Sequence, residues 1–416
     1  MKFVHAADVH LDSPLRGLQH YEGAPVEELR GATRRALTNL VDLALEEEAA
    51  FLLLAGDLFD DDWKDFSTGL FFVKEMNRLM AGGVPVIWVA GNHDSVSQVT
   101  KSLTLPEQVR QLAHKKAETH VLEELGVAIH GQSFATRAVD RDLACDFPAK
   151  RTGYFNIGLL HTSVNGREGH DTYAPCTINT LREKGYEYWA LGHVHTREVL
   201  CEEPWVVFPG NIQGRNIRET GSKGCTLVTV DGRDVQSVEH RPLDVLRWEE
   251  VVVKAPANGQ GRHVVDAFEK LLKTVHEHHE GMPLAVRVRV VGRSNAHRAL
   301  LSSPERWAAE IRNCANSCDG VWVEKVKFDT ASVEENVLPE IEGPLSALLS
   351  ALDGLEPDSD VVAELKEDVR DLLAKVPELK DQDDFVDLEK PEDVAQLAES
   401  VKQMLLAQLS GEGEAE

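Results

Sequence analysis

The 416-residue sequence lacks a hydrophobic run long enough to cross a membrane. A membrane-spanning helix takes ~20 consecutive apolar residues, and no segment comes near that length. The first ten residues, MKFVHAADVH, also lack the apolar stretch and the small-residue cleavage site of a secretory signal. The sequence therefore predicts a cytoplasmic protein that does not reside in a membrane.

Cysteine is scarce and scattered. The chain has six cysteines and no CxxC pair, a pattern that indicates reduced thiols, as in a cytoplasm. Cys314 and Cys318 would share one face of a helix and could form a metal-binding or redox pair, although buried single thiols are the commoner case.

Positively charged residues are also few. The chain has 44 Lys and Arg against 70 Asp and Glu, which gives a net charge of -26. Residues 331–416 hold 24 acidic and 6 basic side chains, a net charge of -18, which leaves -8 for the rest of the chain. Because the acidity is concentrated in the C-terminal region, the net charge does not exclude phosphate binding elsewhere in the chain.

The chain is long enough for two or three domains, and its pattern changes twice. Residues 1–245 alternate β-branched strands with helical stretches, which is typical of an α/β domain. The predicted helices include 32–48 and 66–81, and the predicted strands are 2–7, 51–55, 84–90, 127–130, 155–161, 188–191, 205–209 and 225–230. Residues 246–330 predict a small α+β domain in the order strand, helix, strand, helix, strand. Residues 331–416 predict an acidic helical region. Its two amphipathic helices, at 362–376 and 394–404, would dock on another protein or fold back on their own domain.

Five polar motifs follow predicted strands of the first domain. They are Asp8-Val9-His10, Gly56-Asp57, the GNHD sequence at 91–94, His161 after FNIGLL, and Gly192-His193-Val194-His195. Each motif alone is weak, but five in succession, each after a strand, are not expected by chance. A rigid sheet can hold the side chains at its strand ends together, so we expect these residues to form one site.

The residue types in these motifs point to metal ions. Imidazole and carboxylate ligands suit manganese, iron or zinc better than magnesium or calcium, which prefer oxygen ligands only. Asp57, on a tight turn after Gly56, is the natural carboxylate to be shared by two ions. Two divalent ions ~3.5–4 Å apart would lower the pKa of a bridging water and grip a phosphate, which is what hydrolysis of a phosphodiester requires.

The motifs resemble those of the calcineurin-like metallophosphoesterases over about residues 1–245, and within them the DNA-repair nuclease branch that contains SbcD and YhaO. Longer segments are similar to the YhaO type: HLDSPLRGL at 10–18, HTSVNGREGHDTYAPC at 161–176, YEYWALGHVHTREVL at 186–200 and PGNIQGRNIRETGSKGC at 209–225. The resemblance implies a four-layer α/β/β/α metallophosphoesterase sandwich, a small α+β capping domain and a helical C-terminal tail.

The resemblance also implies two sets of metal ligands that share one aspartate, with manganese as the usual metal and iron or zinc as alternatives. The first set is Asp8, His10, Asp57 and His195. The second set is Asp57, Asn92, His161 and His193.

Two further residues of the GNHD motif receive roles from the resemblance. His93 would contact the phosphate and protonate the leaving oxygen. Asp94 would orient the ring of His93, or else only cap the loop. Asn216 stands where YhaO-type chains are expected to have a histidine, so we assign no catalytic role to segment 209–218, although Arg215 and Arg218 could line the groove.

Three functions remain in competition. The first is a manganese-dependent DNA exonuclease or endonuclease in DNA repair that forms a homodimer and binds an SMC-like ABC ATPase through its C-terminal helices. The second is a nucleotide phosphodiesterase or a phosphoprotein phosphatase, because the ligand set reports phosphoryl chemistry and not the leaving group. The third is a non-catalytic scaffold for the ATPase, against which the complete ligand set and His93 argue.

Overall fold

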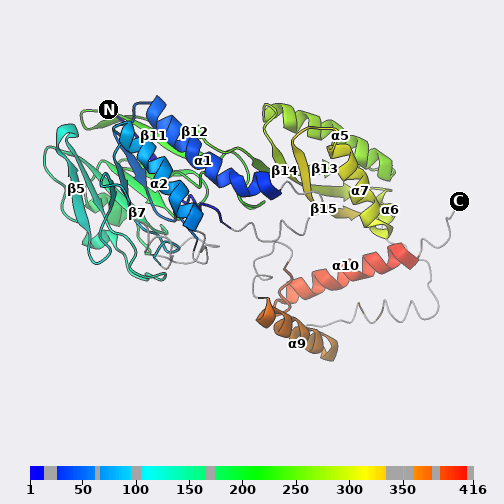
Figure 1. The fold of residues 1–416 in the computed structure, drawn as a ribbon. Coiled ribbons are helices and arrows are strands. Elements are labelled where there is room, and N and C mark those ends of the chain that lie inside the picture. The colour runs from blue at the N-terminus through cyan, green and yellow to red at the C-terminus, as the bar shows by residue number, and fades with distance from the viewer. Residues whose placement is uncertain are drawn as a thin grey trace. The chain divides into compact units, whose positions relative to one another are not determined.

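The computed structural model describes residues 1–13, 26–60, 66–95, 105–164, 174–333, 350, 352, 359–376 and 385–409. The chain forms two compact units (Figure 1). The first unit comprises residues 1–250, 276–287 and 319–324, and the second comprises residues 251–275, 288–318 and 325–416.

The first unit contains a six-stranded sheet with four parallel strands at one end. Its order is β12 (Asp234–Pro242), β11 (Gly224–Asp231), β1 (Lys2–Ala6), β2 (Leu52–Leu54), β3 (Val86–Trp88) and β4 (Val109–Gln111). Strands β1 to β4 are parallel, and β11 pairs antiparallel with both β1 and β12. Helices α1 (Val26–Glu46) and α2 (Phe66–Ala81) pack on its outer face through a continuous apolar cluster.

A second six-stranded sheet lies in the same unit. Its order is β5 (Glu118–Leu122), β6 (Val127–Gly131), β7 (Phe155–His161), β8 (Tyr188–Gly192), β10 (Trp205–Phe208) and β9 (Glu198–Glu202). Strands β6, β7, β8 and β10 are parallel, and the two edge strands are antiparallel to their neighbours. Its outer face is covered by helix α4 (Ile178–Glu183) and by the segment around the short 3-10 helix η3 (Ala144–Asp146).

The inner faces of the two sheets pack on each other. Strand β2 lies in the run FLLLA, in which every residue is buried, as expected of a strand covered on both faces. Phe3 stacks on Phe51 with ring centroids 4.9 Å apart, and both belong to a cluster that includes Phe155 and Tyr188 of the second sheet. The layers therefore follow the order α/β/β/α, as the family resemblance implied.

Residues 247–331 form a smaller α+β arrangement. The three-stranded sheet has the order β13 (Arg247–Lys254), β14 (Leu284–Arg293) and β15 (Val321–Ala331), and its helices are α5 (Gly261–His278), α6 (His297–Ser302) and α7 (Pro304–Ala315). Helix α6 was not predicted. The division into two units cuts through this sheet, so the predicted domain boundaries at 245 and 330 stay predictions.

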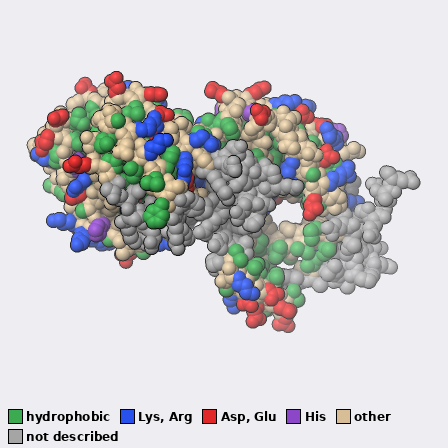
Figure 2. Space-filling model, viewed as in Figure 1, with side chains coloured by type: hydrophobic (Ala, Val, Ile, Leu, Met, Phe, Trp, Pro, Cys, Tyr) green, Lys and Arg blue, Asp and Glu red, His purple; other side chains and the backbone are tan. Residues whose placement is uncertain are grey.

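In the described part of the C-terminal region, helices α9 (Asp360–Lys375) and α10 (Pro391–Leu409) overlap the two segments that were predicted to be helical, 362–376 and 394–404. Val362 of α9, Val394 of α10 and Leu388 form a small buried cluster. Other apolar residues of α9 are exposed, and Figure 2 shows such side chains beside acidic ones in this region. None of the described helices is both long and apolar enough to span a bilayer.

Candidate metal centre

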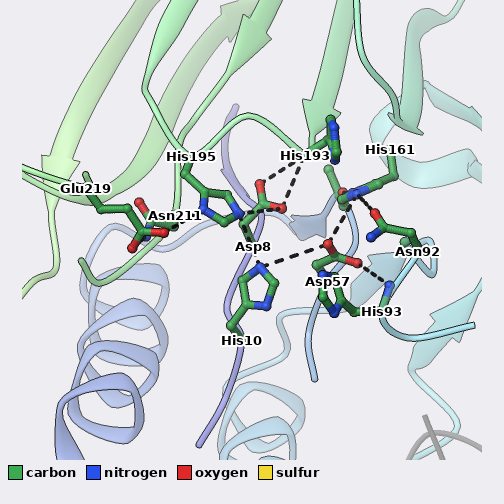
Figure 3. Close-up of polar contacts among 12 residues, drawn as sticks. Asp8, His10, Asp57, Asn92, His93, His161, His193, His195, Asn211 and Glu219 are labelled. Carbon is green, nitrogen blue, oxygen red and sulfur yellow. Dashed lines mark hydrogen bonds and ion pairs between the residues drawn. The ribbon is translucent and has the colours of Figure 1, made fainter. Parts of the chain in front are cut away.

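The site lies where five strands end. Strands β1, β2 and β3 of the first sheet and β7 and β8 of the second all run into predicted ligands, and Figure 3 shows these side chains converging. The residues concerned are Asp8, His10, Asp57, Asn92, His161, His193 and His195. Because one end of each sheet supplies the ligands, the packing of the two sheets positions the whole set.

The backbone at four of these residues adopts a left-handed conformation. The φ angles are 52° at Asp8, 43° at His10, 53° at Asp57 and 106° at His193. Such angles are uncommon for residues other than glycine and persist only where the surroundings hold them. Here the amides of Asp8 and His10 donate to the carbonyl oxygens of Gly56 and Asp57, each at 3.0 Å. Positive φ angles at residues whose side chains converge are typical of functional sites, which supports this region as the candidate site.

Two glycines of the motifs allow close approach of the ligands. A Cβ atom on Gly91 would lie 2.2 Å from Oδ1 of Asp57, and one on Gly56 would lie 2.5 Å from Nδ1 of His161. Gly56 also has a φ of 95°, which side chains disfavour. The glycines of the GD and GNHD motifs are therefore required by the geometry of the ligands beside them.

Two imidazoles face each other across the first ligand set. Nδ1 of His10 lies 2.6 Å from Oδ1 of Asp60, and Nδ1 of His195 lies 2.7 Å from Oε1 of Glu219. An ionised carboxylate only accepts, so in the neutral rings both Nδ1 atoms carry the proton. The two Nε2 atoms, 3.2 Å apart, then present lone pairs to the same space. Such an arrangement suits a cation between the rings.

His161 shows the same pattern in the second ligand set. Its Nδ1–H donates to the carbonyl oxygen of Ala55 at 2.9 Å, so the lone pair of the neutral ring is on Nε2. Nε2 lies 2.9 Å from Oδ1 of Asn92 and 3.4 Å from Oδ2 of Asp57, which are both acceptors. Burial opposes a charge on this ring, but Asp57 and Asp8 outweigh it and raise the pKa of His161 to about 9. A proton thus occupies a place where the donor atoms would suit a metal ion.

The remaining contacts bring the two ligand sets together. Ligand atoms of Asp8, His10 and His195 lie within 4.8 Å of one another, and so do those of Asp8, Asp57 and His161. The amide of His193 donates to Oδ2 of Asp8 at 3.0 Å. The His193 ring lies 5.2 Å from that of His161. The donor set of carboxylates, imidazoles and one amide fits divalent ions of the manganese, iron and zinc type.

His93 lies at the accessible side of the site. Its amide donates to Oδ1 of Asp57 at 3.0 Å, and its side chain is 30% exposed. The centroid of its ring is 5.1 Å from that of His10. The side chain of His195 is 25% exposed, whereas those of Asp8, His10 and Asp57 are almost completely buried. Substrate would therefore approach from the side of His93 and His195.

Asp94 occupies a different place from the one that its ring-orienting role would require. Its Oδ1 accepts from the amides of Leu58 and Phe59, at 2.9 and 3.0 Å, and its Oδ2 accepts from the amide of Gly91 at 3.0 Å. Burial and the nearby Asp57 raise the pKa of Asp94 to about 7. The geometry favours the loop-capping alternative, in which Asp94 ties the loop after β2 to the GNHD loop.

Two further carboxylates at this site, Asp60 and Glu219, lie outside the predicted ligand set. Asp60 accepts from His10, and Glu219 accepts from His195, from Nδ2 of Asn211 at 2.8 Å and from Arg215. Metal-binding histidines commonly donate their other ring N–H to a carboxylate in this way. The only signal for Asp60 was its position three residues after Asp57, and Glu219 had no signal beyond its place in segment 209–225.

Segment 209–218 contributes unequally to the site. Arg215 lies beside it, with Nη2 at 3.0 Å from Oε1 of Glu219 and 3.3 Å from Nδ1 of His195. Asn216 is exposed, and its Oδ1 accepts from the amide of Arg218 at 2.9 Å. Asn216 thus stabilises a turn, in keeping with the absence of a catalytic assignment.

Comparison with known proteins identifies the family. Residues 1–197 match the calcineurin-like phosphoesterase model, and residues 248–331 match the model of the middle domain of metallophosphoesterase YhaO. The chain is 36% identical over 313 residues to the uncharacterized metallophosphoesterase YhaO of Bacillus subtilis (strain 168), over 73% of this chain and 74% of that protein. It is 25% identical over 259 residues to the DNA double-strand break repair protein Mre11 of Sulfurisphaera tokodaii, over 59% and 63% of the two chains.

A solved structure, TT1561 of Thermus thermophilus, covers 57% of this chain and 98% of that one at 13% identity. The TM-score of the two structures is 0.33.

The fold and the site define a phosphoesterase that depends on divalent metal ions. The chain belongs to the calcineurin-like metallophosphoesterases and is similar to YhaO within them.

Proposed function

We propose that this protein hydrolyses phosphodiester bonds in DNA and uses two divalent metal ions held around Asp57. The observation that carries the proposal is the convergence of imidazole lone pairs and carboxylates from five strand ends. Asp8, His10 and His195 would complete one metal position with Asp57. Asn92, His161 and His193 would complete the other.

The chain's own groups divide the work of the reaction. Bound divalent ions would supply a water nucleophile at neutral pH and would screen charge on the phosphoryl oxygens. The Asp60 and Glu219 carboxylates fix the tautomers of two ligand histidines. As the water oxygen bonds to phosphorus, the bond to the leaving oxygen breaks, and His93 delivers a proton to that oxygen. Its partly exposed position, with 30% of the side chain accessible to solvent, suits this role.

DNA is the favoured substrate because of two similarities. The first similarity is the match of residues 248–331 to the YhaO middle domain, which the chain carries in addition to its metal centre. Several relatives carry the name DNA double-strand break repair protein Mre11, including one in Sulfolobus acidocaldarius that is 27% identical over 291 residues. A nucleotide phosphodiesterase or phosphoprotein phosphatase remains the alternative, because the ligands act on the phosphoryl group and not on the leaving group. Manganese is the proposed metal, and the proposed location is the cytoplasm.

Two partners are proposed. An SMC-like ATPase would dock on the C-terminal helices, where α9 carries exposed apolar residues. A second copy of the chain would cover Phe66 and Leu70, which lie one turn apart at the start of α2 and are 71% and 69% exposed.

The decisive experiment compares His93→Ala with the wild-type protein on labelled single- and double-stranded linear DNA in the presence of Mn²⁺. We expect wild-type cleavage, a loss of at least about 100-fold in the variant, as for removal of a general acid, and unchanged Mn²⁺ binding by calorimetry. His114→Ala, at an exposed histidine in another loop, is the matched control. Full cleavage by His93→Ala would remove the role of His93. Hydrolysis of a cyclic nucleotide or a phosphoprotein without cleavage of DNA would favour the alternative.

A further inference from the structure

The loop of residues 213–219 (the 213–219 loop) connects the metal centre to the region that matches the YhaO middle domain. At one end, Oε1 of Glu219 accepts from Nδ1 of His195 at 2.7 Å. At the other end, Nε1 of Trp248, in β13, donates to the carbonyl oxygen of Gly214 at 3.1 Å. Trp248 is the first residue of the matched region, and it belongs to the same compact unit as the metal centre.

The start of the 213–219 loop is held by buried hydrogen bonds. Gln213, which is 2% exposed, donates through Nε2 to the carbonyl oxygens of Leu246 and Gly214, at 2.7 and 3.0 Å. Its Oε1 accepts from the amide of Val245 at 2.9 Å. Gly214 is buried as well, so its carbonyl oxygen needs these protein donors in place of water. The residues that lead into β13 therefore fix the backbone of the loop.

Apolar contacts hold the same loop. Ile217 packs on a small cluster that contains Trp248 and Trp322. The rings of these two tryptophans meet edge to face, with centroids 6.1 Å apart. A Cβ atom on Gly214 would lie 3.1 Å from Cδ1 of Trp248 and 2.7 Å from the carbonyl oxygen of Glu219. The backbone of Gly214 thus fits closely between the indole and Glu219.

The far end of the loop determines where the Glu219 carboxylate lies. Its Oε2 accepts from the amide of Arg215 at 2.8 Å, and Figure 3 shows the carboxylate beside His195. A shift of the loop would therefore move the group that orients the His195 ring. The His161 ring is oriented differently, because its Nδ1 donates to the carbonyl oxygen of Ala55, directly after β2.

We infer that Trp248 and Gln213 are positioning residues for one of the two proposed metal positions, the one that His195 completes. This inference rests on the proposed function, which places one ion with His195 and the other with His161. Trp248 and Gln213 hold the 213–219 loop, and the loop holds Glu219 against His195. The start of the region that matches the YhaO middle domain is thus part of the metal centre.

Calorimetric titration of the metal-free full chain with Mn²⁺ tests the inference. His195→Ala and His161→Ala first assign the two binding steps, because each variant removes a ligand of one position. Trp248→Phe keeps an aromatic ring without the N–H, and Gln213→Met keeps the length of the side chain without its hydrogen bonds. Each should weaken the step that His195→Ala abolishes by about 10-fold, as for other groups that orient ligand histidines. The other step should be unchanged.

Trp307→Phe is the matched control. Nε1 of Trp307 donates to the carbonyl oxygen of Ala299 at 2.9 Å, so this variant loses the same type of hydrogen bond in the other compact unit. Both of its binding steps should equal those of the wild type. In a Glu219→Gln background, Trp248→Phe should weaken the His195 step no further, because it acts through that carboxylate.

A substitution that only destabilises the fold gives a different pattern, since it weakens both binding steps or neither. Wild-type affinity at both steps in Trp248→Phe and Gln213→Met, or equal weakening of both steps, overturns the inference. Thermal unfolding of the metal-free proteins shows which variants fold. Where one does not fold, Ile217→Ala, a smaller change in the same loop, takes its place and should weaken the same step.

Failure of the proposed function is recognised separately. Wild-type protein that shows both binding steps but does not cleave DNA refutes the DNA substrate and leaves the test of Trp248 and Gln213 intact. A single binding step in the wild type refutes the proposed pair of metal positions. If His195→Ala leaves that single step unchanged, the inference is overturned as well.

Discussion

His161 is completely buried beside Asp57, and this pair responds to pH in the metal-free protein. The carboxylates raise the pKa of His161 to about 9, above the 6.5 of an unperturbed histidine. The metal-free fold therefore gains stability from this proton below pH 6.5 and loses it as the pH rises to about 9. A metal ion at Nε2 must displace the same proton.

Mn²⁺ affinity should accordingly keep rising with pH between 6.5 and about 9. Calorimetry in buffers of different ionisation enthalpy measures both the affinity and the protons released. We expect release of close to one proton at pH 7.5 from this ring. An affinity that is flat across the interval would show that His161 is neutral before the metal binds.

The residues that converge on the site were largely predictable from their motifs, whereas the groups that orient them were not. All seven predicted ligands lie at or shortly after the ends of strands. They could be predicted because an apolar strand followed by a polar residue is recognisable in the sequence. Asp60 and Glu219 act through contacts 50 and 24 residues away in the chain, with His10 and His195. Such contacts form only when the sheets pack together, so no local sequence pattern predicts them.

At the scale of elements, burial separates the strands that were predicted from those that were not. Strand β7 and helix α2 were predicted at their observed bounds, and both carry regular apolar patterns. The four strands missed in the first unit, β4, β5, β9 and β12, are the edge strands of its two sheets. An edge strand has fewer buried positions, so its sequence, such as DVQSVEHRP in β12, does not show the apolar run that a central strand requires.

Helix α9 has a second apolar face that its own cluster does not cover. Val361, Leu365, Leu372 and Val376 are 39 to 64% exposed, at spacings that place them on one side of the helix. Under the proposed partnership, Leu372→Asp should prevent co-purification of the ATPase, because a charge would be buried in the apolar interface. Glu367→Gln, on the opposite side, is the control. Hydrolysis of thymidine p-nitrophenyl phosphate should be unchanged in both variants, and undiminished co-purification in Leu372→Asp would exclude this face.

At the scale of the whole molecule, charge is distributed unevenly. Residues 345–416 carry -14 of the net charge of -26. Removing them should strengthen DNA binding at low salt, since repulsion between like charges lowers both association rate and affinity. The gain should shrink at about 200 mM salt, where repulsion is screened within ~10 Å. Fluorescence anisotropy with a labelled oligonucleotide measures both conditions, and an equal gain at both would indicate direct obstruction by the tail instead.

The left-handed backbone at Asp8, His10, Asp57 and His193 has a consequence for the history of such chains. Each non-glycine residue in this conformation costs roughly 1–2 kcal/mol, so selection for catalysis maintains a local instability that selection for folding alone would remove. A descendant of this protein that no longer acted as an enzyme would be expected to acquire glycine at these positions early. Its thermal stability would be expected to rise with each such change.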